Sequence, residues 1–303
     1  MKQTEYPVCF ECEGEILVGI LHPAISPSNT GIVIVVGGPQ YRIGSHRHFV
    51  ELGRKASKGG IPVLRFDVRG MGDSSGAFPG FEAIDSDIAA AVDVFIREQP
   101  QITNVILWGL CDGASASIFY APRDRRVKGL VLLNPWIRSD ATYAKTELRH
   151  YYGAKILDGS FWRRLVSGDV DLRDAAQSLA SRLRAATTSE TAPDTGHCRN
   201  DIDPAAPLPE RMAQGIASFK GDILLIISGN DLTAKEFDDV TQKADAWKPL
   251  LSADRVARRD LEESDHTFSR ADWSSAVNKW TIEWAQEMSA AASTNSNQSL
   301  LYS

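Results

Sequence analysis

Short apolar runs bounded by turn residues recur along this chain, and they alternate with segments of helical periodicity. Residues 61–66 form a run rich in β-branched and apolar side chains, whereas residues 81–98 carry apolar side chains at helical spacing. This alternation favours a parallel sheet flanked by helices, because parallel strands need crossover connections. The predicted strands are 16–21, 31–36, 61–66, 104–108, 127–133, 222–228 and 255–261, and the predicted helices are 48–59, 81–98, 114–120 and 272–287.

The strand rhythm stops between residues 137 and 220, where Arg-rich amphipathic segments replace it. A length of 303 residues suits one α/β core with an insertion. We therefore predict a core of residues 1–136 and 221–288, and a helical cap or lid of residues 137–220. Within the lid, residues 187–209 hold almost no large apolar side chain, so we expect a mobile segment. The Ser-, Ala- and Asn-rich residues 289–303 are expected to form a disordered tail.

Composition excludes several classes of protein. The net charge of -6 leaves no broad basic surface for phosphates, so nucleic acid is not an expected partner. Glutamates at positions 5, 11, 13 and 15 interrupt the apolar region that an export signal needs. No apolar stretch approaches the roughly 18 residues of a membrane-spanning helix. We expect a cytoplasmic protein without an integral membrane segment, and reduced thiols at its four cysteines.

Cys9 and Cys12 form a C-x-x-C pair that could be half of a zinc site or a redox pair. No second C-x-x-C accompanies it, and positions 9 and 12 of an extended strand point to opposite faces. We interpret both as ordinary strand residues and expect no metal site.

The turn Gly109-Leu110-Cys111-Asp112-Gly113 follows a predicted buried strand and precedes a predicted helix. A G-x-nucleophile-x-G turn in that setting is typical of the α/β-hydrolase fold, where the glycines let strand and helix approach each other. The helix N-terminus would also stabilise a thiolate. We predict Cys111 as the nucleophile; the competing interpretation is a small buried residue in a common turn.

An acid and a histidine should follow the nucleophile along the chain, each after a late strand. Asp231 follows the strand 222–228, and His266 follows the strand 255–261. Both have ordinary alternatives, since Asp231 could cap a helix and His266 could be a surface residue. Asp140 is the second candidate for the acid. Asp265 adjoins His266 in sequence, so their side chains would diverge.

Attack on a carbonyl creates an oxyanion that needs preorganised N–H donors. We predict the backbone N–H of Asp112 as one donor and that of Gly38 or Gln40 as the other, unless the loop is an ordinary tight turn. The sequence assigns no role to the Asp112 carboxylate. Tyr41 and Arg42 follow the same loop and could bind an anionic part of the substrate, or simply face solvent.

Four separated segments form a recognisable set, namely residues 37–42, 65–74, 108–112 and 265–269. Together they resemble the exosortase A system-associated hydrolase 1 group of α/β-hydrolases. The resemblance implies an α/β-hydrolase fold, a bacterial protein connected with exopolysaccharide production, and a hydrolase activity, but no substrate.

The leading hypothesis is a cysteine-dependent hydrolase of a small-molecule ester or thioester, acting through a covalent acyl-enzyme without a cofactor. An acyltransferase with the same triad is one alternative. A non-catalytic ligand-binding protein of the same fold is another. The sequence does not give the oligomeric state, and a homodimer is possible.

Overall fold

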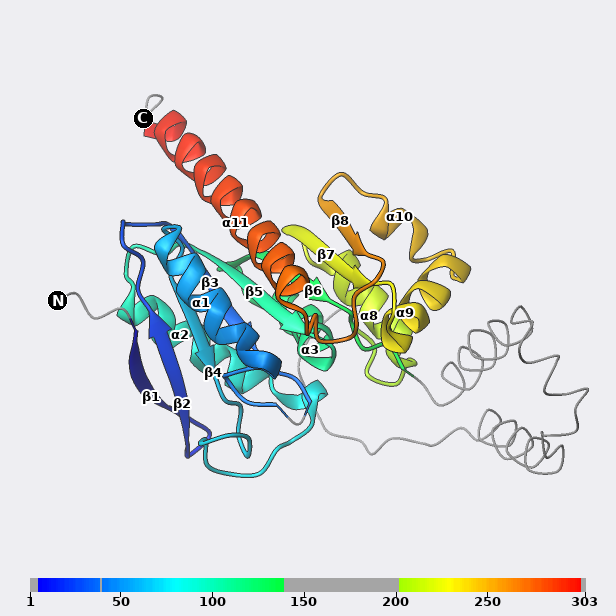
Figure 1. Ribbon diagram of the computed structural model, residues 1–303, viewed down its shortest axis with the longest axis horizontal. Helices are drawn as coiled ribbons and strands as arrows, with labels where there is room; N and C mark the ends of the chain where they lie inside the picture. Colours follow the sequence, from blue (N-terminus) through cyan, green and yellow to red (C-terminus); the bar gives the residue numbers. More distant parts are fainter. Residues whose placement is uncertain (1–4, 39, 139–201, 301–303) are drawn as a thin grey trace, which may run out of the picture.

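The computed structural model describes residues 5–38, 40–138 and 202–300 (Figure 1). In this part of the chain an eight-stranded sheet has the order β1-β2-β4-β3-β5-β6-β7-β8. β1 and β2 form an antiparallel hairpin, β2 is antiparallel to β4, and the pairs from β4 to β8 are parallel. The predicted α/β fold with a mostly parallel sheet is confirmed. The strands are β1 (Tyr6–Cys12), β2 (Glu15–His22), β3 (Thr30–Val35), β4 (Val63–Phe66), β5 (Asn104–Leu110), β6 (Val127–Leu133), β7 (Asp222–Ser228) and β8 (Val256–Leu261).

The hairpin between β1 and β2 turns at Glu13 and Gly14, which both have positive φ, as a two-residue hairpin loop requires. Within β1, Cys9 is exposed and Cys12 is buried. The two thiols therefore lie on opposite faces, as the strand geometry predicted.

Helices cover both faces of the sheet, so its central strands are buried on each side. On one face, Ile32 and Ile34 of β3 share a cluster with residues of α1 and α11, and on the other face Val33 packs with α2, α3 and α8. Each large side chain buried in this way contributes roughly 1.5–3 kcal/mol. The helices are α1 (His48–Lys58), α2 (Asp85–Glu98), α3 (Asp112–Tyr120), α8 (Leu208–Ser218), α9 (Leu232–Lys243), α10 (Lys248–Leu251) and α11 (Ala271–Leu300), with short 3-10 turns at Ser45–Arg47, Phe81–Ala83 and Ala121–Arg123.

The end of the insertion differs from its predicted boundary at residue 220. Helix α8 belongs to the core, because Met212 and Ile216 are buried in the same cluster as α3. Ile202 and Leu208 also pack against that cluster, so the described end of the predicted mobile segment 187–209 is ordered. The physical reason is topological: β6 and β7 are parallel neighbours, and α8 is the helix that returns the chain between them. The predicted lid residues 139–201 lie outside the described residues.

The C-terminal segment also differs from the prediction of a disordered tail at 289–303. α11 continues to Leu300, and Figure 1 shows it projecting beyond the sheet. The Ser289 hydroxyl donates to the Asn29 side-chain oxygen at 2.9 Å, which ties this part of the helix to the start of β3. Three consecutive alanines after Ser289 favour helix, and sequence reasoning gave them too little weight. In the described ranges, no helix has both the length and the apolar character needed to cross a membrane.

Candidate active site

Cys111 occupies the turn between β5 and α3 with φ of 60° and ψ of -125°, a conformation that L residues rarely adopt. A Cβ atom on Gly109 would lie 2.5 Å from the backbone of Gly113, and one on Gly113 would lie 2.5 Å from the Val35 carbonyl oxygen. The two glycines therefore provide the clearance that the sequence pattern predicted. The Cys111 N–H donates to the Leu133 carbonyl at 2.9 Å, which holds the turn against β6.

The loops after β7 and β8 bring Asp231 and His266 to the same edge of the sheet as Cys111. His266 Nδ1 lies 2.8 Å from Asp231 Oδ2, and His266 also hydrogen-bonds the Cys111 side chain. Because Nδ1 faces the carboxylate, the contact with sulfur falls to Nε2. The structure thus brings together the three side chains that were predicted from their order in the chain.

The charge on His266 is governed by these two neighbours. Burial lowers the pKa of His266, but the hydrogen bonds and charges of Asp231 and Cys111 outweigh burial and raise that pKa to about 10. The imidazolium form is therefore favoured next to the sulfur. Cys111 also lies at the N-terminus of α3, where the helix dipole favours negative charge. Both features place positive potential at this end of the site.

Asp231 has the second role that the sequence left open. It is the N-cap of α9, and its carboxylate accepts from the N–H groups of Thr233 at 3.2 Å and Ala234 at 3.0 Å. Asp265 instead orders the histidine loop, because its carboxylate accepts from the N–H groups of Thr267 and Ser269. The other candidate acid, Asp140, lies outside the described residues.

One predicted donor of the oxyanion hole, the Gly38 N–H, is occupied by a side chain. The Gly38 N–H donates to Asp112 Oδ2 at 2.7 Å, and the Gly113 N–H donates to Asp112 Oδ1 at 3.1 Å. Burial raises the pKa of Asp112, while these backbone donors and His266 act in the opposite direction. The prediction that Gly38 offers a free donor therefore differs from the structure. Gln40 lies beside the loop with a buried side-chain oxygen that has no hydrogen-bond partner in the described part of the chain.

Arg42 does not present a free cation to a substrate. Its guanidinium binds the carboxylates of Asp67 and Asp73, and its backbone N–H donates to Asp67 Oδ1 at 2.6 Å. Two carboxylates already neutralise Arg42 in this geometry, so its anion-binding role stays a prediction that these contacts do not support. The neighbouring Tyr41 is 45% exposed. Both residues were assigned by their position after the loop, which carries no information on the acidic loop after β4.

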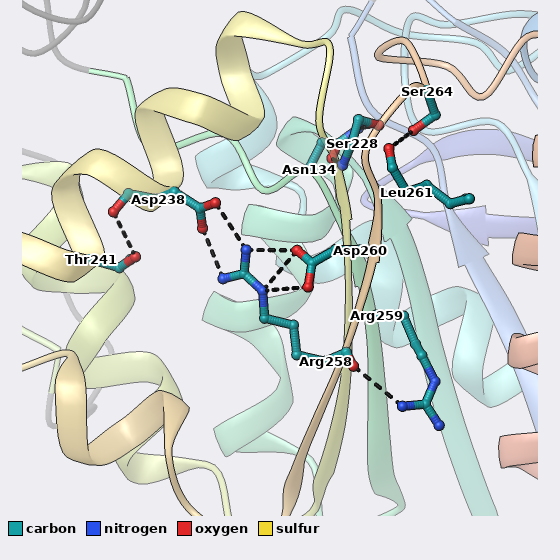
Figure 2. A network of polar contacts seen from close by, with 9 residues as sticks. All are labelled: Asn134, Ser228, Asp238, Thr241, Arg258, Arg259, Asp260, Leu261 and Ser264. Carbon is teal, nitrogen blue, oxygen red and sulfur yellow. Dashed lines mark hydrogen bonds and ion pairs between the residues drawn. The ribbon is translucent and has the colours of Figure 1, made fainter.

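Sequence reasoning missed Asn134 and Ser228, which lie together at the ends of β6 and β7 (Figure 2). Asn134 is fully buried, and its Nδ2 donates to Ser228 Oγ at 2.8 Å and to the His266 carbonyl at 3.0 Å. Ser228 N–H donates to Asn134 Oδ1, and Ser228 Oγ donates to the Asp265 carbonyl, both at 2.8 Å. The available signal was a polar residue at the end of each of two adjacent buried strands.

A second polar contact positions the same loops. Arg258 of the edge strand β8 binds Asp238 of α9 at 2.8 Å and 2.9 Å, and it also binds Asp260 of its own strand (Figure 2). Because Asp231 begins α9 and His266 follows β8, this ion pair joins the two elements that carry the acid and the base. Its partly exposed charges contribute modestly to stability.

Comparisons with known proteins agree with this architecture. The profile of the alpha/beta hydrolase family matches residues 32–279. The human protein ABHD12B is 33% identical over 124 residues, which cover 38% of this chain and 33% of that protein. The chain therefore spans about a third of the length of that relative.

Solved structures of low sequence identity share the fold. An esterase from Pyrococcus furiosus has a TM-score of 0.61 at 16% identity, covering 93% of this chain and 90% of that one. A thermostable carboxyl esterase from Bacillus coagulans has a TM-score of 0.60 at 13% identity, covering 94% and 99%. A proline iminopeptidase from Mycobacterium smegmatis has a TM-score of 0.59 at 12% identity, covering 95% and 100%.

Proposed function

The chain belongs to the alpha/beta hydrolase family, and on that premise we propose that it hydrolyses esters or thioesters with Cys111 as the nucleophile. The observation that carries the proposal is the continuous contact from Asp231 through His266 to Cys111, with 2.8 Å between Nδ1 and Oδ2. Nucleophile, base and orienting acid are in reach of one another, which is the geometry that nucleophilic catalysis requires.

The reaction follows from this arrangement in two halves. The Cys111 thiolate attacks the acyl carbon, an S–C bond forms, and the carbonyl electron pair moves onto oxygen. When the tetrahedral intermediate collapses, the bond to the leaving group breaks and the His266 imidazolium gives that group its proton. Neutral His266 then takes a proton from water, the hydroxide attacks the thioester, and the thiolate is released with the acid product. Throughout, Asp231 holds Nδ1–H and stabilises the charged ring.

Two solved structures with this fold are described as esterases, which supports a carboxylic ester as substrate. The resemblance to the exosortase A system-associated group supports a bacterial setting linked to exopolysaccharide production. A cytoplasmic location and a homodimer remain predictions from the sequence. An acyltransferase would share the first half of the reaction and differ only in the second nucleophile, so product analysis with and without an added alcohol separates the two activities.

The test is formation of an acyl-enzyme at Cys111. The full-length protein is treated with p-nitrophenyl acetate, and intact mass spectrometry follows acetylation while released nitrophenolate follows turnover. Cys111→Ala should abolish both signals. Cys9→Ala is the matched control, because Cys9 is an exposed thiol far from the triad in the sheet order, at β1. Its variant should retain both signals.

Two results would contradict the proposal. Turnover that survives in Cys111→Ala would remove the cysteine from the reaction. Reversible binding of an acyl compound without any adduct in the wild-type protein would favour the non-catalytic alternative.

A further inference from the structure

The carboxylate of Asp112 occupies one of the two donors expected for an acyl oxyanion. Its oxygens accept from the N–H groups of Gly38 at 2.7 Å and Gly113 at 3.1 Å. The Gly38 N–H belongs to the loop after β3, which supplies one oxyanion donor in a site of this design, and the Gly113 N–H is next along the chain to the Asp112 N–H, which supplies the other. A donor that already serves an internal carboxylate cannot serve a substrate oxygen at the same time.

The loop after β3 is shaped around this carboxylate. A Cβ atom on Gly37 would lie 2.1 Å from Asp112 Oδ1, so any other residue at position 37 would collide with the carboxylate. Gly38 has a φ of 60°, and the nearest atoms to its missing Cβ are the two Asp112 oxygens, at 3.7 Å and 3.8 Å. Gly37 therefore provides the clearance for the loop backbone to lie against the carboxylate, and Gly38 provides the positive φ that turns its N–H toward it.

We infer that Asp112 is an internal anion that fills the oxyanion hole, and that an acyl substrate is accepted only when this carboxylate swings out. The inference rests on the proposed function, since it concerns acylation of Cys111. A negative carboxylate and a tetrahedral oxyanion repel each other at such distances, and they compete for the Gly38 N–H. Asp112 would thus select for substrates that can displace it and slow the reaction with small, simple esters.

Two reagents distinguish an effect on the oxyanion hole from an effect on the reactivity of the Cys111 thiol. p-Nitrophenyl acetate acylates a thiolate through an oxyanion, with nitrophenolate as the leaving group. Iodoacetamide alkylates the same thiolate at a saturated carbon, with iodide as the leaving group, and forms no oxyanion. An effect on the hole changes the first rate alone, whereas an effect on thiolate formation changes both rates.

The experiment measures both rates at Cys111 by intact mass in the wild-type protein, Asp112→Ala and Asp112→Asn. One oxyanion donor is worth about 10²–10³ in rate, so Asp112→Ala should raise acetylation by about 10- to 100-fold and change alkylation less than about threefold. Asp112→Asn keeps the shape and an oxygen acceptor for Gly38 but loses the charge, so it should give a smaller rise.

Several outcomes overturn the inference. Unchanged or slower acetylation in Asp112→Ala means that Asp112 assists the reaction or lies outside it. A parallel rise in both rates places the effect on the thiolate. If Asp112→Ala does not fold, Asp112→Asn decides alone, and acetylation no faster than wild type is a negative result. Alkylation of Cys111 without acetylation in any variant contradicts the proposed function itself, which is a different pattern from a failure of the inference alone.

Discussion

One carboxylate, that of Asp231, both caps α9 and holds His266, and a conservative substitution can separate the two roles. Asn is about as good an N-cap as Asp, because its one side-chain oxygen can still accept from the first N–H groups of α9, so Asp231→Asn should preserve the cap. An amide carries no charge and cannot balance the imidazolium of His266. We therefore expect a variant that folds normally and reacts poorly.

The magnitudes follow from the contacts. Asp231→Asn should change the free energy of unfolding through the lost charge-assisted bond by at most about 1.5–3 kcal/mol, whereas Asp231→Ala should lose roughly a further 1 kcal/mol with the cap. Removing the orienting acid of a serine triad lowers kcat about 10⁴-fold. A thiolate depends less on its base than an alkoxide does, so we expect a loss of about 10²–10³-fold in kcat/KM, or roughly 2.7–4 kcal/mol.

The pH profile gives a second readout. His266 has a folded pKa of about 10, above its ordinary value of 6.5. Its stabilisation is therefore complete below pH 6.5 and is lost as pH rises through 10. Without the Asp231 charge the folded pKa falls. The leaving group of an alkyl ester takes its proton from the His266 imidazolium, so the alkaline limb of kcat/KM for such an ester should move to lower pH in Asp231→Asn.

The assays are the kinetics of alkyl ester hydrolysis, the pH dependence of kcat/KM, and urea unfolding, each on wild type, Asp231→Asn and Asp231→Ala. If Asp231→Asn keeps kcat/KM within about threefold of wild type, the carboxylate is only a helix cap. An alkaline limb that stays in place would show that another group sets the charge of His266.

Three further predictions concern the residues that support the candidate site and two buried histidines. Asn134→Ala should lower kcat about tenfold with little change in KM and destabilise the fold by about 1–3 kcal/mol, since it leaves buried polar groups near His266 unpaired. Kinetics and urea unfolding measure the two effects, and an unchanged kcat would argue against a role of Asn134 in positioning His266. Gly113→Ala should prevent the turn at Cys111 from forming, because its methyl group would lie 2.5 Å from the Val35 carbonyl oxygen. Soluble yield and Tm test this expectation, and an active, stable variant would refute it. Burial lowers the pKa of His22 and of His48 to about 4, below the ordinary 6.5. Their contribution to the free energy of unfolding should therefore be complete above pH 6.5 and fall as pH drops toward 4. Urea unfolding from pH 7 to 4 measures this dependence, and His48→Gln should make the free energy of unfolding less dependent on pH.

The sheet and the meeting of Cys111, Asp231 and His266 could be predicted, because both follow from local patterns and their order in the chain. Apolar runs identify buried strands, and Gly109 and Gly113 identify a turn whose geometry admits little else. The places of Asp231 and His266 follow from chain order once the parallel sheet is assumed, since the ends of parallel strands meet at one edge. No side-chain conformation enters that reasoning.

Side-chain direction is what the sequence could not supply. Asp112 could point toward the sulfur, toward solvent or toward the loop after β3, and only the last places it on the Gly38 N–H. Arg42 was assigned to a substrate from its position after the strand 31–36. Its partner Asp67 lies on a different loop, which follows β4, so the sequence did not reveal this contact. Each choice depends on a contact between segments far apart in the chain, so periodicity and turn chemistry do not determine it.

The segment after β6 explains how Cys111 and His266, which lie on separate loops, keep a common geometry. The Leu133 carbonyl accepts from the Cys111 N–H, and the Trp136 N–H donates to the Cys111 carbonyl, so this segment holds the nucleophile from both sides. Asn134, between them, has a positive φ and binds the His266 carbonyl. The same short stretch of backbone thus fixes both the nucleophile and the base. A shift of the segment would move Cys111 and His266 together, which preserves their contact, whereas loss of the Asn134 amide would free His266 alone.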